Sequence, residues 1–227
     1  MHYVSQEVEL SEEKKEMTAV EIVILADIER RLLLEEVAEF EAILQRGEND
    51  GGDSGTLSAE AQKRYSEVLE QLQLIGAESA ERRAIELLEN LGFTEALRSR
   101  PLKALSGMYG NNGLISSSLL YIAFCMTFLY YLTGGWRVRT MLAAAIFARP
   151  DVLLLDEPTN HLSILAVLWL ARELSTNPVW NDRIIVIVSH DRYFIDEVCK
   201  DVLHISGIAQ RLTQSKGNYS LWASRRA

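Results

Sequence analysis

The sequence is poor in cysteine, the residue whose disulfide bonds cross-link many proteins outside the cell. Its 227 residues include 2 cysteines, Cys125 and Cys199. This number is too small for a disulfide framework and favours a reducing compartment. The first residues lack a basic stretch followed by an apolar run. We therefore expect no secretory signal peptide and a cytoplasmic location.

Basic residues are scarce relative to acidic ones. The formal net charge is −9 at pH 7. Residues 1–60 hold 16 Asp or Glu against 5 Lys or Arg, so this segment alone carries a net charge of −11. A general nucleic-acid binder needs a basic face to displace phosphate counterions, so we expect no DNA partner. A direct partner of the acidic segment is expected to be a basic protein surface.

A phosphate-binding loop of the form Gly-x-x-x-x-Gly-Lys-Ser/Thr is also absent from the 227 residues. The nearest similar stretch, residues 107–113, has glycines but no lysine after them. The backbone N–H groups and the lysine of such a loop cradle the phosphates of a bound nucleotide. What this absence excludes depends on the motifs that are present.

The first half of the chain has the periodicity of helices. Apolar residues three to five positions apart predict one long amphipathic helix over 17–45. A Gly- and Asp-rich loop over 47–58 separates it from a second predicted helix over 59–75. A third helix is predicted over 78–91, with Gly92 as its C-cap. Two long helices joined by a polar loop favour a projecting hairpin, although two helices of an ordinary helical subdomain fit the pattern equally well.

From Asp151 onward strands alternate with helices, which is typical of an α/β sheet. Continuous apolar or β-branched runs over 152–155 and 184–188 predict buried strands, the first of the kind found in parallel sheets. The predicted strands cover 152–155, 184–188, 202–205 and 210–213, and the predicted helices cover 164–174 and 193–199.

Two of these strands end in residues suited to nucleotide hydrolysis. The first is followed by Asp156 and Glu157, and the second by Ser189-His190-Asp191. One carboxylate at a strand end helps to hold Mg²⁺, and the next orients or activates the attacking water. A histidine there donates to a γ-phosphate oxygen. An acidic strand end or a lone histidine is more often structural, but the two strand ends together favour a catalytic site.

These motifs resemble those of ATP-binding cassettes. Asp156 is similar to the Walker B aspartate, which is a Mg²⁺ ligand, and Glu157 to the catalytic glutamate that follows it. Ser189-His190-Asp191 is similar to the switch-histidine motif, with His190 as a catalytic residue. Gly134-Gly135-Trp136-Arg137 resembles the signature motif in its Trp-Arg form, which is similar to eukaryotic ABC-F proteins. Residues 3–7 resemble their Q-loop, with Gln6 as the Mg²⁺-linked glutamine. Residues 217–220 resemble their end-of-cassette motif.

The resemblance implies an α/β fold, a partial P-loop NTPase or ABC nucleotide-binding domain with a helical subdomain and a projecting helical-hairpin arm. It implies a first cassette of the translation-control type, truncated at its N-terminus. The expected division is a Q-loop remnant over 1–10, the arm and helical subdomain over 11–107, an apolar insert over 108–134, and the signature helix with the Walker B and switch half over 135–227.

The family's ligands and partners follow from the same resemblance. The cofactors it implies are ATP and Mg²⁺, with ATP hydrolysis coupled to work on the ribosome. A second cassette, which this sequence does not contain, completes the site. Signature residues of one cassette offer N–H groups and a helix N-terminus to the γ-phosphate held by the other. The residues expected to do so here are Ser106, Gly107, Gly134 and Gly135.

The sequence departs from the family in the signature motif and beside it. Leu105-Ser106-Gly107 provides the first half and Gly135-Trp136-Arg137 the second, and residues 108–134 separate them. The uncharged stretch 114–132 is long enough to cross a bilayer. A membrane span inside this domain would contradict its burial, so we favour a translated intron over a membrane-spanning or buried helix. Ser163 stands where the family usually has an aspartate that crosses the cassette interface.

Two other functions remain open from the sequence. A non-catalytic remnant would keep the arm and the sheet as a docking module, which the missing phosphate loop favours. A transporter cassette is disfavoured by Trp136 after the glycines and by the acidic arm.

Because the 227 residues contain no phosphate-binding loop, we expect the purified chain by itself to bind ATP weakly. Titration of the chain with a fluorescent ATP analogue, followed by competition with ATP, measures this affinity. A dissociation constant in the micromolar range would contradict the expectation.

Overall fold

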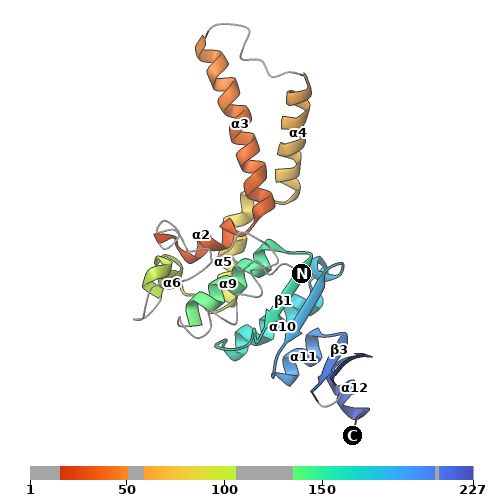
Figure 1. Ribbon diagram of the computed structural model, residues 1–227. Coiled ribbons are helices and arrows are strands. Elements are labelled where there is room, and N and C mark those ends of the chain that lie inside the picture. Colours follow the sequence, from red (N-terminus) through yellow and green to blue (C-terminus); the bar gives the residue numbers. More distant parts are fainter. Residues whose placement is uncertain (1–15, 51–58, 106–134, 208–209, 227) are drawn as a thin grey trace.

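The computed structural model describes residues 16–50, 59–105, 135–207 and 210–226 (Figure 1). Figure 1 shows a long helical hairpin that projects from a body of helices and strands, with the C-terminal elements at the end of the body away from the hairpin.

The predicted arm is present as two helices that lie side by side. They are α3 (Ile28–Asp50) and α4 (Ala59–Leu74). A small apolar cluster between them includes Leu33, Val68 and Leu72. Further along the hairpin, the rings of Phe40 and Tyr65 meet edge to face, with centroids 5.6 Å apart. These contacts bury a stripe along each helix, as expected for amphipathic partners.

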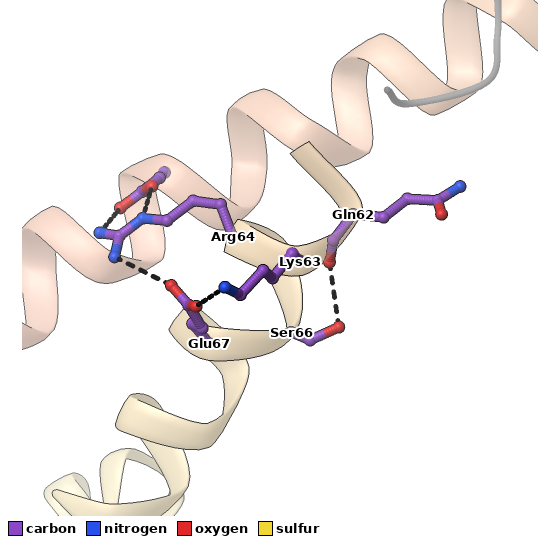
Figure 2. Close-up of polar contacts among 6 residues, drawn as sticks. Gln62, Lys63, Arg64, Ser66 and Glu67 are labelled. Atoms are coloured by element: carbon purple, nitrogen blue, oxygen red, sulfur yellow. Dashed lines mark hydrogen bonds and ion pairs between the residues drawn. The ribbon is translucent and has the colours of Figure 1, made fainter. Parts of the chain in front are cut away.

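A charged contact also links the two arm helices. Arg64 Nε donates to Glu36 Oε1 at 2.7 Å and Arg64 Nη2 donates to Glu36 Oε2 at 2.9 Å. Figure 2 shows that Arg64 also approaches Glu67, and that Lys63 reaches the same carboxylate. The hydrogen bond from Arg64 holds the pKa of Glu36 below its usual value. Since the pair is exposed, it fixes the alignment of the helices more than it stabilises them.

The prediction of one helix over 17–45 is wrong. The structure has α2 (Ala19–Leu25) and then α3, with a break at Ala26 and Asp27. The backbone N–H of Ala26 bonds to Val23 at 3.2 Å, a tighter turn than an α-helix makes. Asp27 Oδ1 accepts from the Arg30 N–H at 3.0 Å and so caps the start of α3.

The helical subdomain follows the arm. It consists of η2 (Ala77–Ser79), α5 (Ala80–Asn90), α6 (Glu95–Arg98) and α7 (Leu102–Leu105). The prediction that Gly92 ends this helix is confirmed: α5 ends at Asn90, and Gly92 lies just beyond it with a φ of 92°.

The most deeply buried helix is α9 (Gly135–Ala148). Every residue from Thr140 to Phe147 is buried. It packs against α2, α5 and α7, and its residues belong to one apolar cluster with Leu153 and Leu155. This helix therefore joins the helical subdomain to the strands.

The strands form two small sheets. β1 (Val152–Asp156) and β2 (Ile184–Val188) are parallel, in register from Val152–Ile184 to Asp156–Val188. Between them run α10 (Ile164–Thr176) and η3 (Pro178–Trp180). After β2 come α11 (Arg192–Val198), an antiparallel pair of β3 (Asp201–Ser206) with β4 (Arg211–Lys216), and α12 (Tyr219–Ser224).

The two faces of the parallel pair differ. Leu153 and Leu155 are buried against the core, whereas Ile184, Val186 and Val188 of β2 are exposed. Successive side chains of a strand point to opposite faces, so one face of this sheet carries apolar side chains without cover from the described residues.

In the ranges that the structure describes, no helix is long and apolar enough to cross a membrane. Residues 114–132 lie outside those ranges.

Leu88 and Leu74 make a matched pair for testing this core. Leu88 of α5 is 0% exposed and Leu74 at the end of α4 is 78% exposed. Leu88→Ala removes buried contacts and should lower the free energy of unfolding by about 2–5 kcal/mol. Leu74→Ala should change it by about 0.5 kcal/mol or less. Urea unfolding followed by circular dichroism measures both. Equal losses would contradict this description of the core.

Candidate functional site

The parallel pairing of β1 with β2 brings the two predicted strand ends together. Asp156 pairs with Val188, so the next residues, Glu157 and Ser189, leave the sheet side by side. The backbone N–H of Glu157 donates to the Val188 carbonyl at 2.7 Å and extends the ladder by one bond. The two strand ends that the sequence singled out therefore lie at the same edge of this sheet.

The carboxylate of Glu157 contacts both residues that follow β2. Its Oε2 accepts from the Ser189 hydroxyl at 3.5 Å and from the His190 backbone N–H at 3.3 Å. Its Oε1 lies 3.5 Å from His190 Nε2. Glu157 has a positive φ of 47°, which non-glycine residues rarely adopt. Strained conformations of this kind often occur at functional sites.

The turn after β2 is fixed by two capping side chains. Asp191 Oδ1 accepts from the Phe194 N–H at 3.1 Å and caps α11. Ser189 Oγ accepts from the Asp191 N–H at 3.1 Å. Because an ionised carboxylate can only accept, the Ser189 hydroxyl is the donor in its contact with Glu157. Sequence reasoning treated Ser189 only as part of a motif, and its role toward Glu157 was missed because its partner lies 32 residues away.

His190 stands at the solvent side of the site. Its side chain is fully exposed, whereas that of Glu157 is 23% exposed. An exposed imidazole beside a carboxylate is free to rotate toward a ligand or to remain with the carboxylate. The site is therefore accessible to solvent at His190, whereas the Glu157 side chain is largely covered.

Asp156 is the last residue of β1 and is half-buried. Its carboxylate is the hard oxygen ligand that Mg²⁺ prefers. No group of three His, Cys, Asp or Glu side chains that could hold a metal occurs among the described residues. Mg²⁺ in nucleotide sites is usually held by one or two carboxylates together with phosphates and waters. The residues at the β1 end fit part of such a shell, with Asp156 as the ligand.

The start of α9 lies against the loop that follows β1. A Cβ added at Gly135 would lie 3.1 Å from the Cβ of His161, a tight contact that favours glycine at this approach. His161 also has a positive φ, of 61°. Gly135 is therefore close to the carboxylate loop, in the first turn of a 14-residue helix whose free N–H groups could face an anion.

Other residues of the predicted site are not placed. Gln6, Ser106, Gly107 and Gly134 lie outside the described residues. Ser163, at the expected aspartate position, caps α10 by accepting from the Ala166 N–H at 3.3 Å. This local function explains why a short polar residue stands there.

Several known proteins are similar to this chain in sequence. The family profile described as ABC transporter matches residues 1–160. ABC transporter F family member 3 of Arabidopsis thaliana is 35% identical over 92% of this chain and 26% of its own length. ATP-binding cassette sub-family F member 3 of Homo sapiens is 33% identical over 88% of this chain and 23% of its own. Sub-family F member 2 of Mus musculus is 37% identical over 74% and 21%.

The chain spans about a quarter of the length of these curated relatives. A solved metal-chelate type ABC transporter in an inward-facing conformation aligns with 94% of this chain and 60% of its own, at 12% identity and a TM-score of 0.34, which is too low to bear on the fold.

The matched profile and the two strand ends define an ABC nucleotide-binding domain of the P-loop NTPase fold. The chain belongs to the ABC transporter family of ATP-binding cassettes, and its curated relatives place it in the ABC-F group.

Proposed function

We propose that this chain is part of an ABC-F ATPase in which Glu157 serves as the general base for ATP hydrolysis. The observation that carries the proposal is the contact of the Glu157 carboxylate with Ser189 and His190 at the joined ends of β1 and β2. A carboxylate held at a strand end beside an exposed imidazole suits the orientation of a water toward a γ-phosphate.

Each described site residue has a separate part in this proposal. Asp156 would supply an oxygen ligand to Mg²⁺, and the bound ion would neutralise phosphate charge. Glu157 accepts a proton from the attacking water. His190 swings from Glu157 toward the γ-phosphate and donates to one of its oxygens.

The remaining contacts come from residues outside the described ranges and from a second cassette. ABC-F proteins pair cassettes, and this chain would offer the start of α9 at Gly135, with Ser106, Gly107 and Gly134, to nucleotide held by the other cassette. Gln6 would add a ligand to Mg²⁺. The division of the chain at residues 10, 107 and 134 belongs to the same proposal.

The partner that we propose for the arm is a basic protein surface on the ribosome, in a cytoplasmic role in translation. Residues 1–60 carry a net charge of −11, and α3 presents exposed carboxylates such as Glu35, Glu39 and Glu41. The negative charge of the arm favours association with a basic protein surface and disfavours association with a phosphate backbone, which has the same sign of charge.

Glu157→Gln tests the catalytic proposal. The amide cannot accept the proton of water, so turnover should fall at least about 100-fold with little change in ATP binding. Phosphate release is measured at saturating MgATP, with the chain alone and with the chain fused behind the phosphate-binding strand and loop of an ABC-F relative. Glu70→Gln, an exposed glutamate of α4, is the matched control and should have no effect. Unchanged turnover in Glu157→Gln would reject Glu157 as the base, and no turnover in either preparation would favour a docking module.

The charge of the arm provides a second test. Reversal of three exposed arm carboxylates in the combined variant Glu35→Lys, Glu39→Lys and Glu41→Lys should weaken binding to ribosomes, because like charges then face each other. Co-sedimentation through a sucrose cushion at low and physiological salt measures binding. Asp-for-Glu changes at the same positions keep the charge and should bind normally. Equal pelleting of both variants would contradict a contact through the arm.

A further inference from the structure

The loop that carries Glu157 is held in an unfavourable backbone conformation. Glu157 and His161 both have positive φ, 47° and 61°. Within the loop, the Asn160 N–H bonds to the Glu157 carbonyl and the Leu162 N–H to the Thr159 carbonyl, each at 3.2 Å. Left-handed conformations of non-glycine residues persist only where surrounding contacts hold them.

One side chain from α9 provides such a contact. Arg139 Nη2 donates to the carbonyl oxygen of His161. Arg139 Nη1 donates to the Leu91 carbonyl, at the C-terminal end of α5, at 3.5 Å. The guanidinium also lies over the ring of Trp136, 4.5 Å from its centroid. A single planar group thus meets the loop, the helical subdomain and the first turn of α9.

The surroundings of Arg139 restrict its position. The ring of Trp136 packs edge to face on Phe93, with centroids 5.0 Å apart. Gly92, next to Leu91, lies beside the guanidinium, and a Cβ there would be in ordinary contact with Nη1 at 3.4 Å. At the other end, the close approach of Gly135 to His161 brings the loop against α9. The guanidinium is therefore held from several sides.

We propose that Arg139 is a positioning residue that fixes the loop 157–162, and through it the Glu157 carboxylate, relative to α9 and to the end of α5. Its relevance to hydrolysis rests on the function proposed above, but the contact itself does not. A displacement of α5 would pull on the His161 carbonyl through the same guanidinium. Arginine suits this position because its fork of donors reaches two carbonyls while its flat face stacks on a ring, which the ammonium of lysine cannot do at once.

Hydrogen exchange of the full 227-residue chain tests the proposal without nucleotide. Arg139→Gln should speed exchange of the Asn160 and Leu162 amides by about tenfold or more, because the loop loses a charged donor. Arg139→Lys should give an intermediate rate, since it keeps one cationic donor. Amides of β1 and β2 should keep their exchange rates.

Arg137→Gln is the matched control. Arg137 lies on the same helix, and among the described residues it has no hydrogen bond to the loop. Its substitution should leave exchange in 157–162 within about twofold of the original rate. If Arg139→Gln lowers the stability of the whole domain, the comparison between Arg139→Lys and Arg137→Gln still separates a local effect from a global one.

Two outcomes would overturn the proposal. One is unchanged exchange at Asn160 and Leu162 in both Arg139 variants. The other is an increase in 157–162 that β1 and β2 share in both variants, which would mean that Arg139 only stabilises the domain. In a preparation that hydrolyses ATP, Arg139→Lys should also lower kcat with the KM for ATP unchanged. If Arg139→Lys speeds exchange as expected but leaves kcat unchanged, the result would count against Glu157 as the base, and not against the contact of Arg139 with the His161 carbonyl.

Discussion

The parallel pairing of β1 with β2 is the constraint on which the candidate site depends. The two strands are separated in sequence by α10 and η3, and the Asp156–Val188 register places Glu157 beside Ser189. Below the pair, Leu153 and Leu155 pack on the same cluster as α9, which joins the strands to the helical subdomain. A shift of one residue in this register would turn the buried leucines toward solvent and separate Glu157 from the turn after β2, so burial of the core also fixes the site.

Much of this arrangement could be predicted from the sequence, because strong local patterns produced it. A continuous β-branched run with polar residues at its end predicted β2 with the bounds that the structure has, 184–188. The division between α2 and α3 could not be predicted from periodicity, since the apolar spacing continues through Ala26 and Asp27. The break depends on Asp27 as a helix cap, a signal that is present in the sequence but weaker than the periodic one. Contacts over long sequence separations, such as Arg139 with His161 and with Leu91, depend on the tertiary fold and had no local signal.

The arm and the body are stabilised in different ways. The arm depends on a small cluster around Val68, one pair of rings and exposed ion pairs, of which Arg64 with Glu36 is bidentate. The body has a continuous cluster that extends from α2 through α9 to α10. Fewer buried contacts mean a lower free energy for local opening, so the arm should open before the body. A projecting element with this property can adapt to a partner without disturbing the strand ends.

The contacts of Glu157 divide its two oxygens between different tasks. Oε2 accepts from both the Ser189 hydroxyl and the His190 backbone N–H, so it is anchored by groups that belong to the turn after β2. Oε1 faces the side chain of His190, which is fully exposed and so can leave. In the proposed hydrolysis, a turn of the imidazole toward a ligand would open Oε1 to a water while Oε2 keeps the carboxylate in place. A general base has to accept a proton at one oxygen without moving, and this division of contacts suits that role.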